Sequence, residues 1–532
     1  MAAFCIPTVK GVIVVRADLV LIDGNVLTMD SSQPSAEAVA VKKDRIVKVG
    51  TNEEINSWIG DDTKVIDLQG RTVVPGLIDS HIHVADFGKF LMWIDLKNVT
   101  SIEEMQRRIR ERAQKISKER WIIGSGWDQT RFAEKRYPNR RDLDEASPNN
   151  PVILYHQCGR VCVVNSKALE LAGVTKETRA PSGGEIEKDT ESGEPTGILR
   201  ETATDLVWKT IPEPSEEELV EGASLACKKI VEAGVTTVHW IATSSAEISV
   251  IQKVCSENKL PLHVYPIVPA NLLDQINSSG SNKDGNLGVK VFVDGSLAAH
   301  TAALREPYSD DPASKGELLY SQEELDALVM KVHKANFRLI MHALGDQAID
   351  MALSAIEKAF MEVPRNDHRF RLEHASVLNK ELIQRIKELG MIVSVQPKCV
   401  ITEFSVWSAV ERLGSERARW LYPIKTLIKE GIRVAGGSDC PMEPISPLQG
   451  IQAAVTRQFF PEEQISVDEA LRMYTVNAAY ASFEETVKGS IEEGKLADLT
   501  VLSADPKKTP SSKIGDINVD MTIVGGKVVY QS

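Results

Sequence analysis

Short apolar segments recur eight times between residues 73 and 439, and helical patterns separate the later ones. They are VVPGLIDSHIHV (73–84), VTTVHW (235–240), LHVYPIV (262–268), VKVFVDG (289–295), FRLIMHAL (337–344), RFRLEHA (369–375), MIVSVQP (391–397) and RVAGGSD (433–439). Strands that alternate with helices pair in parallel, so eight of them predict an α/β fold closed as a (β/α)8 TIM-like barrel. A doubly wound open sheet is the alternative.

The segments outside the barrel pattern predict two additions. Both ends of the chain are rich in short strand-like runs with turn residues between them, which favours a composite β-sandwich domain built from 1–72 and 488–532. The barrel domain would then span 73–487. Within it, the interval 85–234 is too long for one crossover and has its own strand candidates, WIIGSGW and PVILYHQ, so we expect an insertion after the first barrel strand.

Charge and cysteine usage limit the classes of partner. The chain has 75 acidic and 62 basic residues, a net charge of −13, which argues against a nucleic-acid or anionic-membrane partner because both require a basic face. No apolar run approaches the ~20 residues that cross a bilayer. The seven cysteines are scattered, which fits a reducing compartment, and we expect a cytoplasmic protein. A homo-oligomer is compatible with the sequence.

Histidines lie at the ends of several predicted strands. His81 and His83 flank Ile82 at the end of the first strand, and residues i and i+2 of a strand point to the same face. In a barrel that face lies near the C-terminal mouth, where barrel enzymes hold their catalytic groups. A single His-x-His pair is a weak signal, and two structural histidines would explain it equally simply.

Donors at the other strands strengthen the metal hypothesis. Lys290 begins the fourth strand, His342 ends the fifth, His374 ends the sixth and Asp439 ends the eighth. Nitrogen and oxygen donors that converge from separate strand ends are the ligands that Zn²⁺ or a similar divalent ion prefers. The sequence therefore predicts a metal centre at the barrel mouth.

Several motifs resemble those of the metal-dependent amidohydrolase superfamily. VVPGLIDSHIHV is similar to its first-strand signature, and GSIEEGKLADLTVL resembles its C-terminal signature. Eight further segments of the chain resemble the pattern of the YtcJ-like amidohydrolases: GSGWDQTRF, RRDLDEASPNNPV, VNSKALELAGV, GEPTGILRE, VKVFVDGSL, HALGDQAID, RLEHA and GSDCP. Together the matching segments run from about residue 15 to 530. The resemblance implies a barrel with a composite β-sandwich, and hydrolysis of an amide-like, non-peptide C–N bond by a metal-activated water.

Position by position, the resemblance also implies roles. Its metal ligands correspond to His81, His83, His342, His374 and Asp439, and Lys290 matches a lysine that some members carry as a carbamate. We expect one or two divalent ions, zinc in the first place, with a carbamylated Lys290 as a candidate bridge. The simpler alternatives are a salt-bridged or snorkelling Lys290 and an Asp439 that caps the following turn.

The expected chemistry assigns two of these residues to catalysis. Asp439 would take a proton from the attacking water as general base and deliver it to the leaving nitrogen. His374 would help to hold the developing oxyanion if it is not a full ligand. Asp294 and Glu373 are polar residues near the same mouth, and we interpret them as hydrogen-bonding groups around the ligands, with Asp294 also a candidate substrate contact.

One stretch departs from the family pattern. Relatives of this type often carry Asp-Gly-His where this chain has Cys158-Gly159-Arg160. Arginine offers a planar fork of donors with a fixed positive charge, so Arg160 is a candidate contact for a carboxylate-bearing small-molecule substrate; a surface arginine is the alternative. Trp127 and Asp128 are candidates for the pocket wall, or they pack the insertion.

Two functional hypotheses follow. The first is a working metal-dependent hydrolase that acts on a C–N bond, which the full ligand set favours. The second is a regulatory or scaffold protein on the same fold with little or no catalysis, which the altered stretch 158–160 favours. A plant member of the family is associated with phytochrome A far-red light signalling; if that resemblance holds, this chain is expected in that pathway and at a perinuclear location.

Overall fold

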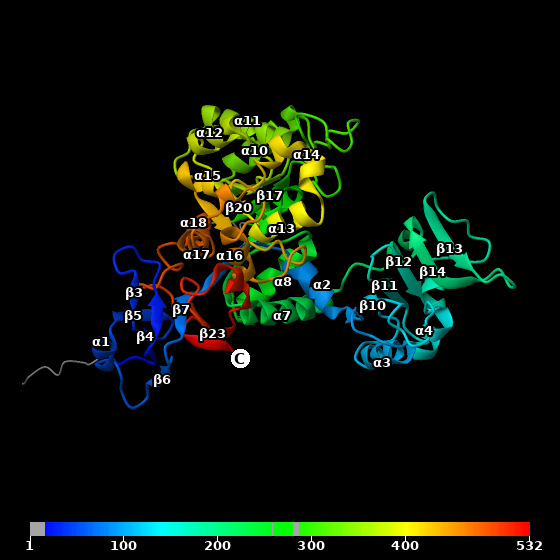
Figure 1. Cartoon of the computed structure of the whole chain (residues 1–532), viewed down its shortest axis with the longest axis horizontal. Coiled ribbons are helices and arrows are strands. Elements are labelled where there is room, and N and C mark those ends of the chain that lie inside the picture. The colour runs from blue at the N-terminus through cyan, green and yellow to red at the C-terminus, as the bar shows by residue number, and fades with distance from the viewer. Residues whose placement is uncertain (1–15, 258, 280–286) are drawn as a thin grey trace, which may run out of the picture. The chain divides into compact units, whose positions relative to one another are not determined.

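The computed structural model describes residues 16–257, 259–279 and 287–532, and they form two compact units (Figure 1). One unit contains the described residues up to Val84 together with Ala226–Ser532, and the other is Ala85–Leu225. The first unit holds both a barrel and a two-sheet sandwich. The domain limits predicted from the sequence, 1–72 with 488–532 around 73–487, stay a prediction.

Eight parallel strands form the barrel of the first unit. In chain order they are β8 (Leu77–Ile82), β15 (Val235–Ile241), β16 (His263–Pro269), β17 (Gly288–Phe292), β18 (Arg338–Ala343), β19 (Arg371–His374), β20 (Ile392–Val395) and β21 (Val434–Gly436). Each pairs in parallel with the next, from β8 at one end to β21 at the other, and the register shifts only between β8 and β15 among these pairs. A further parallel bridge joins Ile82 to Cys440, so the segment after the last strand meets the first. This contact confirms a TIM-like barrel over an open sheet.

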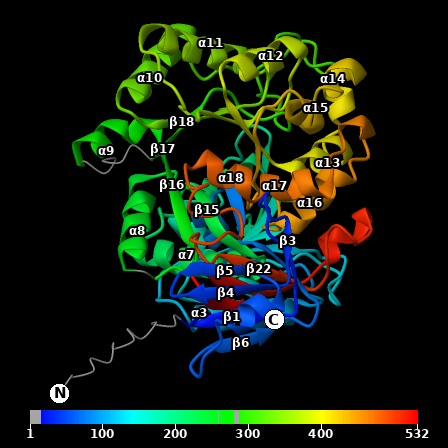
Figure 2. The same cartoon turned by 90° about the vertical axis from the view of Figure 1, so that its left-hand side faces the viewer.

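The predicted helices between the later strands are present on the outside of the barrel. Figure 2 shows α10 (Gln322–Lys334), α11 (Asp346–Glu362) and α12 (Lys380–Glu388) along one side of it. The side chain of Asn379 accepts a hydrogen bond from the Leu382 amide and so caps α12 at its N-terminus. The other helices of this ring are α8 (Ser245–Ser256), α9 (Leu273–Ser279), α13 (Pro397–Ser405), α14 (Ala409–Ala418), α15 (Ile424–Lys429), α16 (Pro447–Val455), α17 (Val467–Met473) and α18 (Val476–Ala481).

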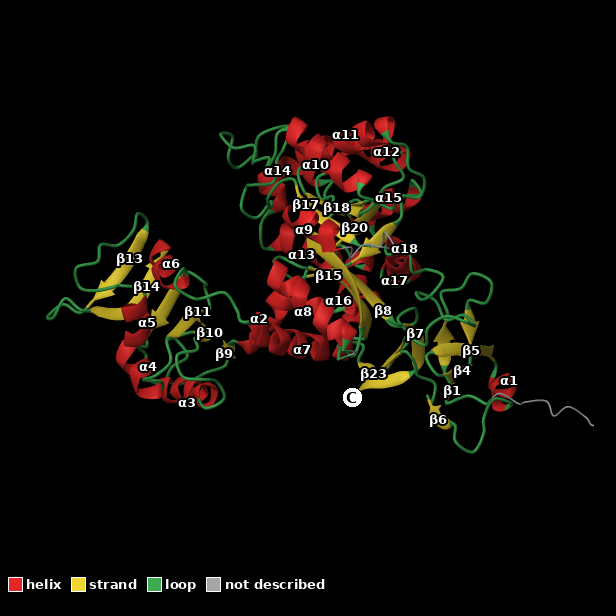
Figure 3. Cartoon of the chain, turned by 180° about the vertical axis from the view of Figure 1, so that it is seen from behind, coloured by secondary structure: helices red, strands yellow, loops and turns green. Residues whose placement is uncertain are grey.

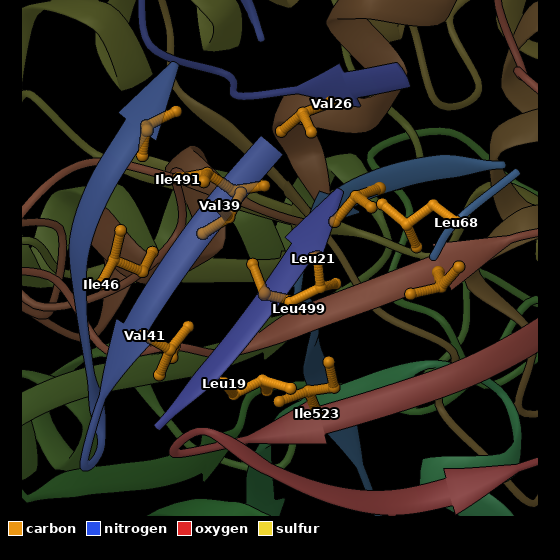
Figure 4. Close-up of a cluster of buried hydrophobic side chains, with 14 of the residues drawn as sticks. Leu19, Leu21, Val26, Val39, Val41, Ile46, Leu68, Ile491, Leu499 and Ile523 are labelled. Carbon is orange, nitrogen blue, oxygen red and sulfur yellow. The ribbon is translucent and has the colours of Figure 1, made fainter. Parts of the chain in front are cut away.

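The early and late segments of the chain share one β-sandwich, also as predicted. One sheet has the order β5-β4-β1-β6 and the other β24-β23-β22-β7-β2-β3. Their bounds are β1 (Leu19–Ile22), β2 (Asn25–Leu27), β3 (Ser35–Ala36), β4 (Ala38–Lys42), β5 (Arg45–Gly50), β6 (Lys64–Asp67), β7 (Thr72–Pro75), β22 (Leu499–Leu502), β23 (Val519–Val524) and β24 (Lys527–Gln531). Figure 4 shows the apolar core between them, to which Leu21 and Val39 contribute from one sheet and Leu499 and Ile523 from the other.

The segment 73–84, expected to be one strand, is two strands in different sheets. Residues up to Pro75 belong to β7 of the sandwich, and the barrel strand β8 begins at Leu77. Gly76 lies at the crossing, where an added Cβ would stand 2.2 Å from Oγ1 of Thr236. The sandwich therefore leads into the strand that carries the His-x-His pair through a close approach that only glycine allows.

The second unit is a three-layer α/β/α structure with the sheet order β13-β14-β12-β11-β10-β9 (Figure 3). Its strands are β9 (Ile94–Asp95), β10 (Ile122–Trp127), β11 (Val152–His156), β12 (Val161–Val164), β13 (Gly184–Lys188) and β14 (Pro195–Glu201), and its helices α3 (Ile102–Ala113), α4 (Arg140–Ala146), α5 (Ser166–Leu171) and α6 (Asp205–Trp208). Successive strand residues face opposite layers: Val152 and Leu154 pack in the cluster of α3 and α4, and Ile153 in that of α5 and α6.

The sequence reading of this unit was right for β10 and β11 but missed a hairpin. The polar stretch 183–197 contains β13 and the first three residues of β14, and the two strands pair antiparallel. Strand β13 lacks the alternation of apolar and polar residues that predicts a strand, because only one of its residues, Ile186, is buried. None of the described helices combines the length and apolar character that crossing a bilayer requires.

Candidate metal centre

Two histidines and an aspartate meet at the mouth of the barrel. His81 lies near the end of β8, His83 just beyond it, and Asp439 three residues after β21. Oδ1 of Asp439 lies 3.3 Å from Nε2 of His81 and 3.4 Å from Nε2 of His83. The three side chains form a group whose ligand atoms all lie within 4.8 Å of one another.

Backbone hydrogen bonds hold this aspartate against the first strand. The amide of Asp439 donates to the carbonyl of His81 at 2.7 Å, and the amide of His83 donates to the carbonyl of Cys440 at 3.0 Å. Asp439 has a left-handed backbone with φ of 57°, which an aspartate adopts at a cost of about 1–3 kcal/mol. The chain keeps this conformation because the barrel closes through it, and the carboxylate is thereby directed at the histidines.

Two more predicted ligands lie beside this group. The ring centroid of His374, at the end of β19, is 4.9 Å from that of His81 and 4.6 Å from that of His342 on β18. His374 also has a left-handed backbone, with φ of 68°. Nε2 of His342 lies 3.1 Å from the carbonyl oxygen of Gly295. The imidazoles of three strands are thus brought together as predicted.

A buried carboxylate orients the first of these histidines. Oε2 of Glu373 is hydrogen-bonded to Nδ1 of His81, and its Oε1 accepts from Nε of Arg371 at 2.9 Å. Arg371 also donates to the carbonyl of Ser80 at 2.6 Å and contacts Nδ1 of His239 at 2.8 Å. Glu373 was predicted from the sequence, but Arg371 was not. Arg371 lies two residues before Glu373 on β19, so that both side chains are on one face of the strand.

Asp79 was missed as well. Its Oδ1 accepts hydrogen bonds from the amides of His81 and Ser438, both at 3.0 Å, and so ties β8 to the segment after β21. Burial raises its pKa to about 6. The signal was present in the sequence, because Asp79, His81 and His83 alternate on a single strand.

Lys290 lies within the same barrel and has an unusual environment. Its side chain is fully buried on β17, and Nζ has no hydrogen-bond partner among the described residues. Burial lowers the pKa of this amine to about 8. A buried ammonium without a partner is costly, so the site favours a neutral or chemically modified lysine.

The protonation states suit a cation. Burial holds the pKa of His374 well below its ordinary value and lowers that of His342 to about 3, so both imidazoles are neutral at pH 7. Burial alone would raise the pKa of Asp439, but the charge of His81 and the hydrogen bonds of His81 and His83 hold it well below its ordinary value. Neutral His342 and His374 and an ionised Asp439 are in the forms that bind metal ions. His81 differs: burial and the charge of Lys290 lower its pKa, but the charges of Asp439 and Glu373 raise it above its ordinary value, so a metal ion would displace a proton from this ring.

The spacing of the donors also fits a divalent ion. Nitrogen and oxygen ligands about 2.0–2.1 Å from a tetrahedral zinc ion lie about 3.3–3.4 Å from one another. The two separations from Asp439 to the histidines, 3.3 Å and 3.4 Å, match this value. The residues present therefore fit the metal that the fold implies.

Comparison with known proteins decides the family. The amidohydrolase family model matches residues 64–530, most of the chain. The chain belongs to the amidohydrolase family. This confirms the resemblance drawn from the motifs, and the amidohydrolase fold and the His-His-Asp group make the chain a metal-dependent hydrolase of this family.

Relatives of this amidohydrolase match it over almost its whole length. The Bacillus subtilis (strain 168) protein YtcJ is 34% identical, with 96% of this chain and 98% of YtcJ covered. Protein LONG AFTER FAR-RED 3 of Arabidopsis thaliana is 35% identical (97% and 92% covered), and the N-substituted formamide deformylase of Arthrobacter pascens is 31% identical (97% and 98% covered). The structure of an uncharacterized metal-dependent hydrolase from Pyrococcus furiosus superposes with a TM-score of 0.76 at 31% identity, covering 92% of this chain and all of that one.

Asp294 supports the metal centre of this amidohydrolase through the backbone. Its carboxylate is buried and accepts hydrogen bonds from the amides of Ala303, Leu344 and Gly345, at 2.8–3.0 Å. Leu344 and Gly345 follow the end of β18, so Asp294 fixes the loop directly after the strand that carries His342. The hydrogen bonds that its carboxylate accepts from the described residues come from backbone amides, and a substrate contact for Asp294 stays a prediction.

The other predicted substrate residues lie in the second unit. The Arg160 side chain is 74% exposed and lies 3.8 Å from Glu201. Trp127 is fully buried in the core of the unit, and its indole donates to the carbonyl of Leu154 at 2.9 Å. Asp128 accepts from Gln157 at 2.8 Å and from Thr130. These contacts fit the packing alternative for Trp127 and the surface alternative for Arg160, and a substrate role for the three stays a prediction.

Proposed function

We propose that this amidohydrolase hydrolyses amide-like C–N bonds outside peptides, with Asp439 as its general base. The observation that carries the proposal is the carboxylate of Asp439 within 3.3–3.4 Å of both first-strand imidazoles, at the mouth of the barrel. The relative named N-substituted formamide deformylase, which matches 97% of this chain, supports a small amide as the substrate.

The residues that would hold the metal are His81, His83 and Asp439, with His342, His374 and Lys290 completing the set. When bound, a divalent ion, zinc in the first place, supplies Lewis acidity that polarises a carbonyl and makes water a nucleophile near neutral pH. The burial of Lys290 and its unpartnered Nζ support a carbamate, which forms when the neutral amine adds CO₂ and releases a proton.

The side chains of this chain perform the proton transfers. Asp439 is ionised at neutral pH, so its carboxylate can accept a proton from the attacking water and return it to the leaving nitrogen. His374 is neutral and has one ring N–H, which suits it to donate a hydrogen bond to the developing oxyanion if it is not a ligand. Glu373 fixes the ring of His81 throughout.

The location we propose is the cytoplasm. Each of the six cysteines that the structure describes is a free thiol, although Cys158 and Cys255 are exposed. Proteins of reducing compartments have this cysteine usage.

The test combines metal content with turnover. Purified protein is expected to contain a stoichiometric divalent metal by elemental analysis and to release an amine from N-alkyl formamides or acetamides but not from unmodified peptides. Asp439→Asn is expected to lose turnover at least a hundredfold, while its circular-dichroism melting curve stays cooperative. Normal turnover in this variant would refute the base assignment, and protein with neither metal nor amidase activity would refute the hydrolase.

That last outcome would favour the alternative, a regulatory or scaffold protein in far-red light signalling. Two observations speak for it: the 35% identical Arabidopsis relative named LONG AFTER FAR-RED 3, and the exposed Arg160 in the stretch that departs from the family pattern.

A further inference from the structure

A cavity separate from the metal centre lies wholly within the unit Ala85–Leu225. Its volume is about 850 Å³, in the range of small-molecule sites, and its wall includes four aromatic side chains, Phe90, Trp93, Tyr155 and Trp208. We call it the aromatic pocket. Nothing in the proposed hydrolysis uses these residues.

The aromatic rings are arranged as walls. Trp93 and Tyr155 are nearly parallel, with an interplanar angle of 15° and centroids 6.4 Å apart. Trp208 stands at 71° to Trp93 and 70° to Tyr155, with centroids 6.0 and 5.9 Å away. Phe90, whose ring centroid lies 4.6 Å from that of Trp93, and Trp208 remain 50% and 42% exposed, which is unusual for side chains of this size that pack against other rings. Exposed rings in such a pocket offer faces on which a planar ligand can stack.

The polar groups of the pocket are mostly donors. Lys97 lines the pocket and makes no ion pair within the described parts of the chain. Arg131 also lines it; its side chain donates a hydrogen bond to the Lys97 carbonyl at 2.7 Å and lies 3.7 Å from Asp128. The lining carboxylate, Asp205, is already paired with Lys209 at 3.8 Å. A positive charge is therefore left without a counter-ion at the pocket.

His156 adds a buried donor. Its Nδ1 accepts a hydrogen bond from the amide of Cys158 at 3.1 Å, so a neutral ring carries its proton on Nε2. That Nε2 is buried and has no hydrogen-bond partner among the described residues. Burial lowers the pKa of His156, which keeps the ring neutral at pH 7. An unsatisfied buried N–H costs free energy that an acceptor on a ligand would recover.

We propose that the aromatic pocket binds a planar aromatic ligand that carries a carboxylate. The ring of the ligand stacks on the exposed Trp208 and meets Trp93 and Tyr155 edge-on, because their planes stand at about 70° to that of Trp208. Its carboxylate pairs with the charge of Lys97 and accepts hydrogen bonds from Arg131 and His156. An aromatic cage for an alkylammonium ion would require an unpaired carboxylate, and the lining residue that could supply it, Asp205, already has a cation beside it. The inference goes beyond the hydrolase and does not depend on it.

The experiment is calorimetric titration of the full chain with three matched probes: 2-naphthoate, 2-naphthalenemethanol and 2-naphthylmethyl-trimethylammonium. Naphthoate is expected to bind about tenfold more tightly than the neutral alcohol, and more weakly as salt is added. Equal affinity for acid and alcohol, tighter binding of the ammonium ion, or no saturation with any probe would each overturn the proposal.

Two variants locate the binding. Trp208→Ala removes an exposed ring and is expected to weaken naphthoate binding about fivefold or more. Lys97→Met is expected to weaken naphthoate about threefold and to leave the alcohol unchanged, whereas the control Lys176→Met, an exposed lysine of the same unit outside the pocket, changes neither. Unchanged affinity in both pocket variants refutes the assignment.

A last arm separates this pocket from the metal centre. A carboxylate can also bind a metal ion, so the naphthoate titration is repeated after treatment with a chelator. Unchanged affinity supports the aromatic pocket, and loss of binding in the metal-free protein overturns it. Because hydrolysis plays no part in this measurement, its failure leaves the proposed function standing.

Discussion

Replacing Glu373 by glutamine tests whether the second carboxylate of the centre controls metal binding through His81. The native carboxylate serves two donors. Oε1 accepts a hydrogen bond from Nε of Arg371 at 2.9 Å and lies 2.7 Å from Nη2 of the same side chain, and Oε2 is hydrogen-bonded to Nδ1 of His81. Glutamine has the same shape but only one acceptor oxygen, and its other terminal group is an NH₂ donor.

The change is expected to move a proton on His81. Arg371 can only donate hydrogen bonds, so the oxygen of the glutamine side chain stays its acceptor and the NH₂ group of the glutamine faces Nδ1 of His81. That nitrogen must then be an acceptor, which places the ring proton on Nε2, the atom 3.3 Å from Asp439. A protonated Nε2 cannot bind a cation, and losses of about 10–100-fold in metal affinity are typical when such a partner is removed.

The same substitution removes a charge from a fully buried pair. Arg371 and Glu373 are 1% and 0% exposed, so loss of a charge-assisted hydrogen bond should cost about 1.5–3 kcal/mol of unfolding free energy. The assays are competition between the metal-stripped variant and a chromophoric chelator, and urea denaturation of the same sample.

Glu485→Gln is the matched control. Its carboxylate makes two bonds of 2.8 Å to Arg369, away from the histidines, and the pair is partly exposed. This control should lose about 1 kcal/mol of stability and keep normal metal affinity. Metal affinity of Glu373→Gln within twofold of the wild type would refute the reasoning about His81.

The remaining predictions concern pH, metal removal and the second unit. Burial raises the pKa of Glu403 to about 7, so the folded chain holds this proton more tightly than the unfolded chain. Relative to Glu403→Gln, the native protein should therefore lose about 3 kcal/mol of stability between about pH 4.5 and 7, and parallel urea midpoints of the two across this range would contradict it. Stripping the metal should remove about 2.7 kcal/mol of stability relative to protein with free metal at 100 times Kd; a melting temperature indifferent to chelator at every metal concentration would disagree. Gly126→Ala should destabilise the chain by about 2 kcal/mol or more, because φ is +98° there and the new Cβ would lie 2.6 Å from Cγ of Lys97; an unchanged melting curve would count against the local geometry.

Sequence patterns predicted the barrel strands well because each is a short apolar run bounded by turns or helices. They failed where one run served two sheets, although the dipeptide Pro75-Gly76, which is typical of turns, marks the crossing. The hairpin of β13 and β14 was missed because its exposed charged residues mask the alternation.

The metal-binding side chains of the candidate centre could be predicted from the sequence, but most of the residues that hydrogen-bond to them could not. Strand-end positions indicated His81, His83 and Asp439, which the structure brings together. Strand alternation put Arg371 on the face of Glu373 and Asp79 on that of His81, but both were overlooked because the residue type alone does not show which group a buried charge pairs with. For Trp127 the sequence left two alternatives open, a pocket wall or packing of the insertion, and its indole lies in the core of the second unit, which fits the packing alternative.

The sandwich has a consequence for the order of events at the ribosome. Strand β7 pairs with β22, with Pro75 opposite Leu499, so its neighbour is translated about 420 residues later. At about 5–20 residues per second this delay is about 20 to 90 s. During it, the edge of β7 that pairs with β22 has no partner strand, although β2 can already pair with the other edge. The nascent polypeptide must be shielded from aggregation over that interval, and chaperone dependence during biosynthesis should therefore be greatest for this half-built sheet.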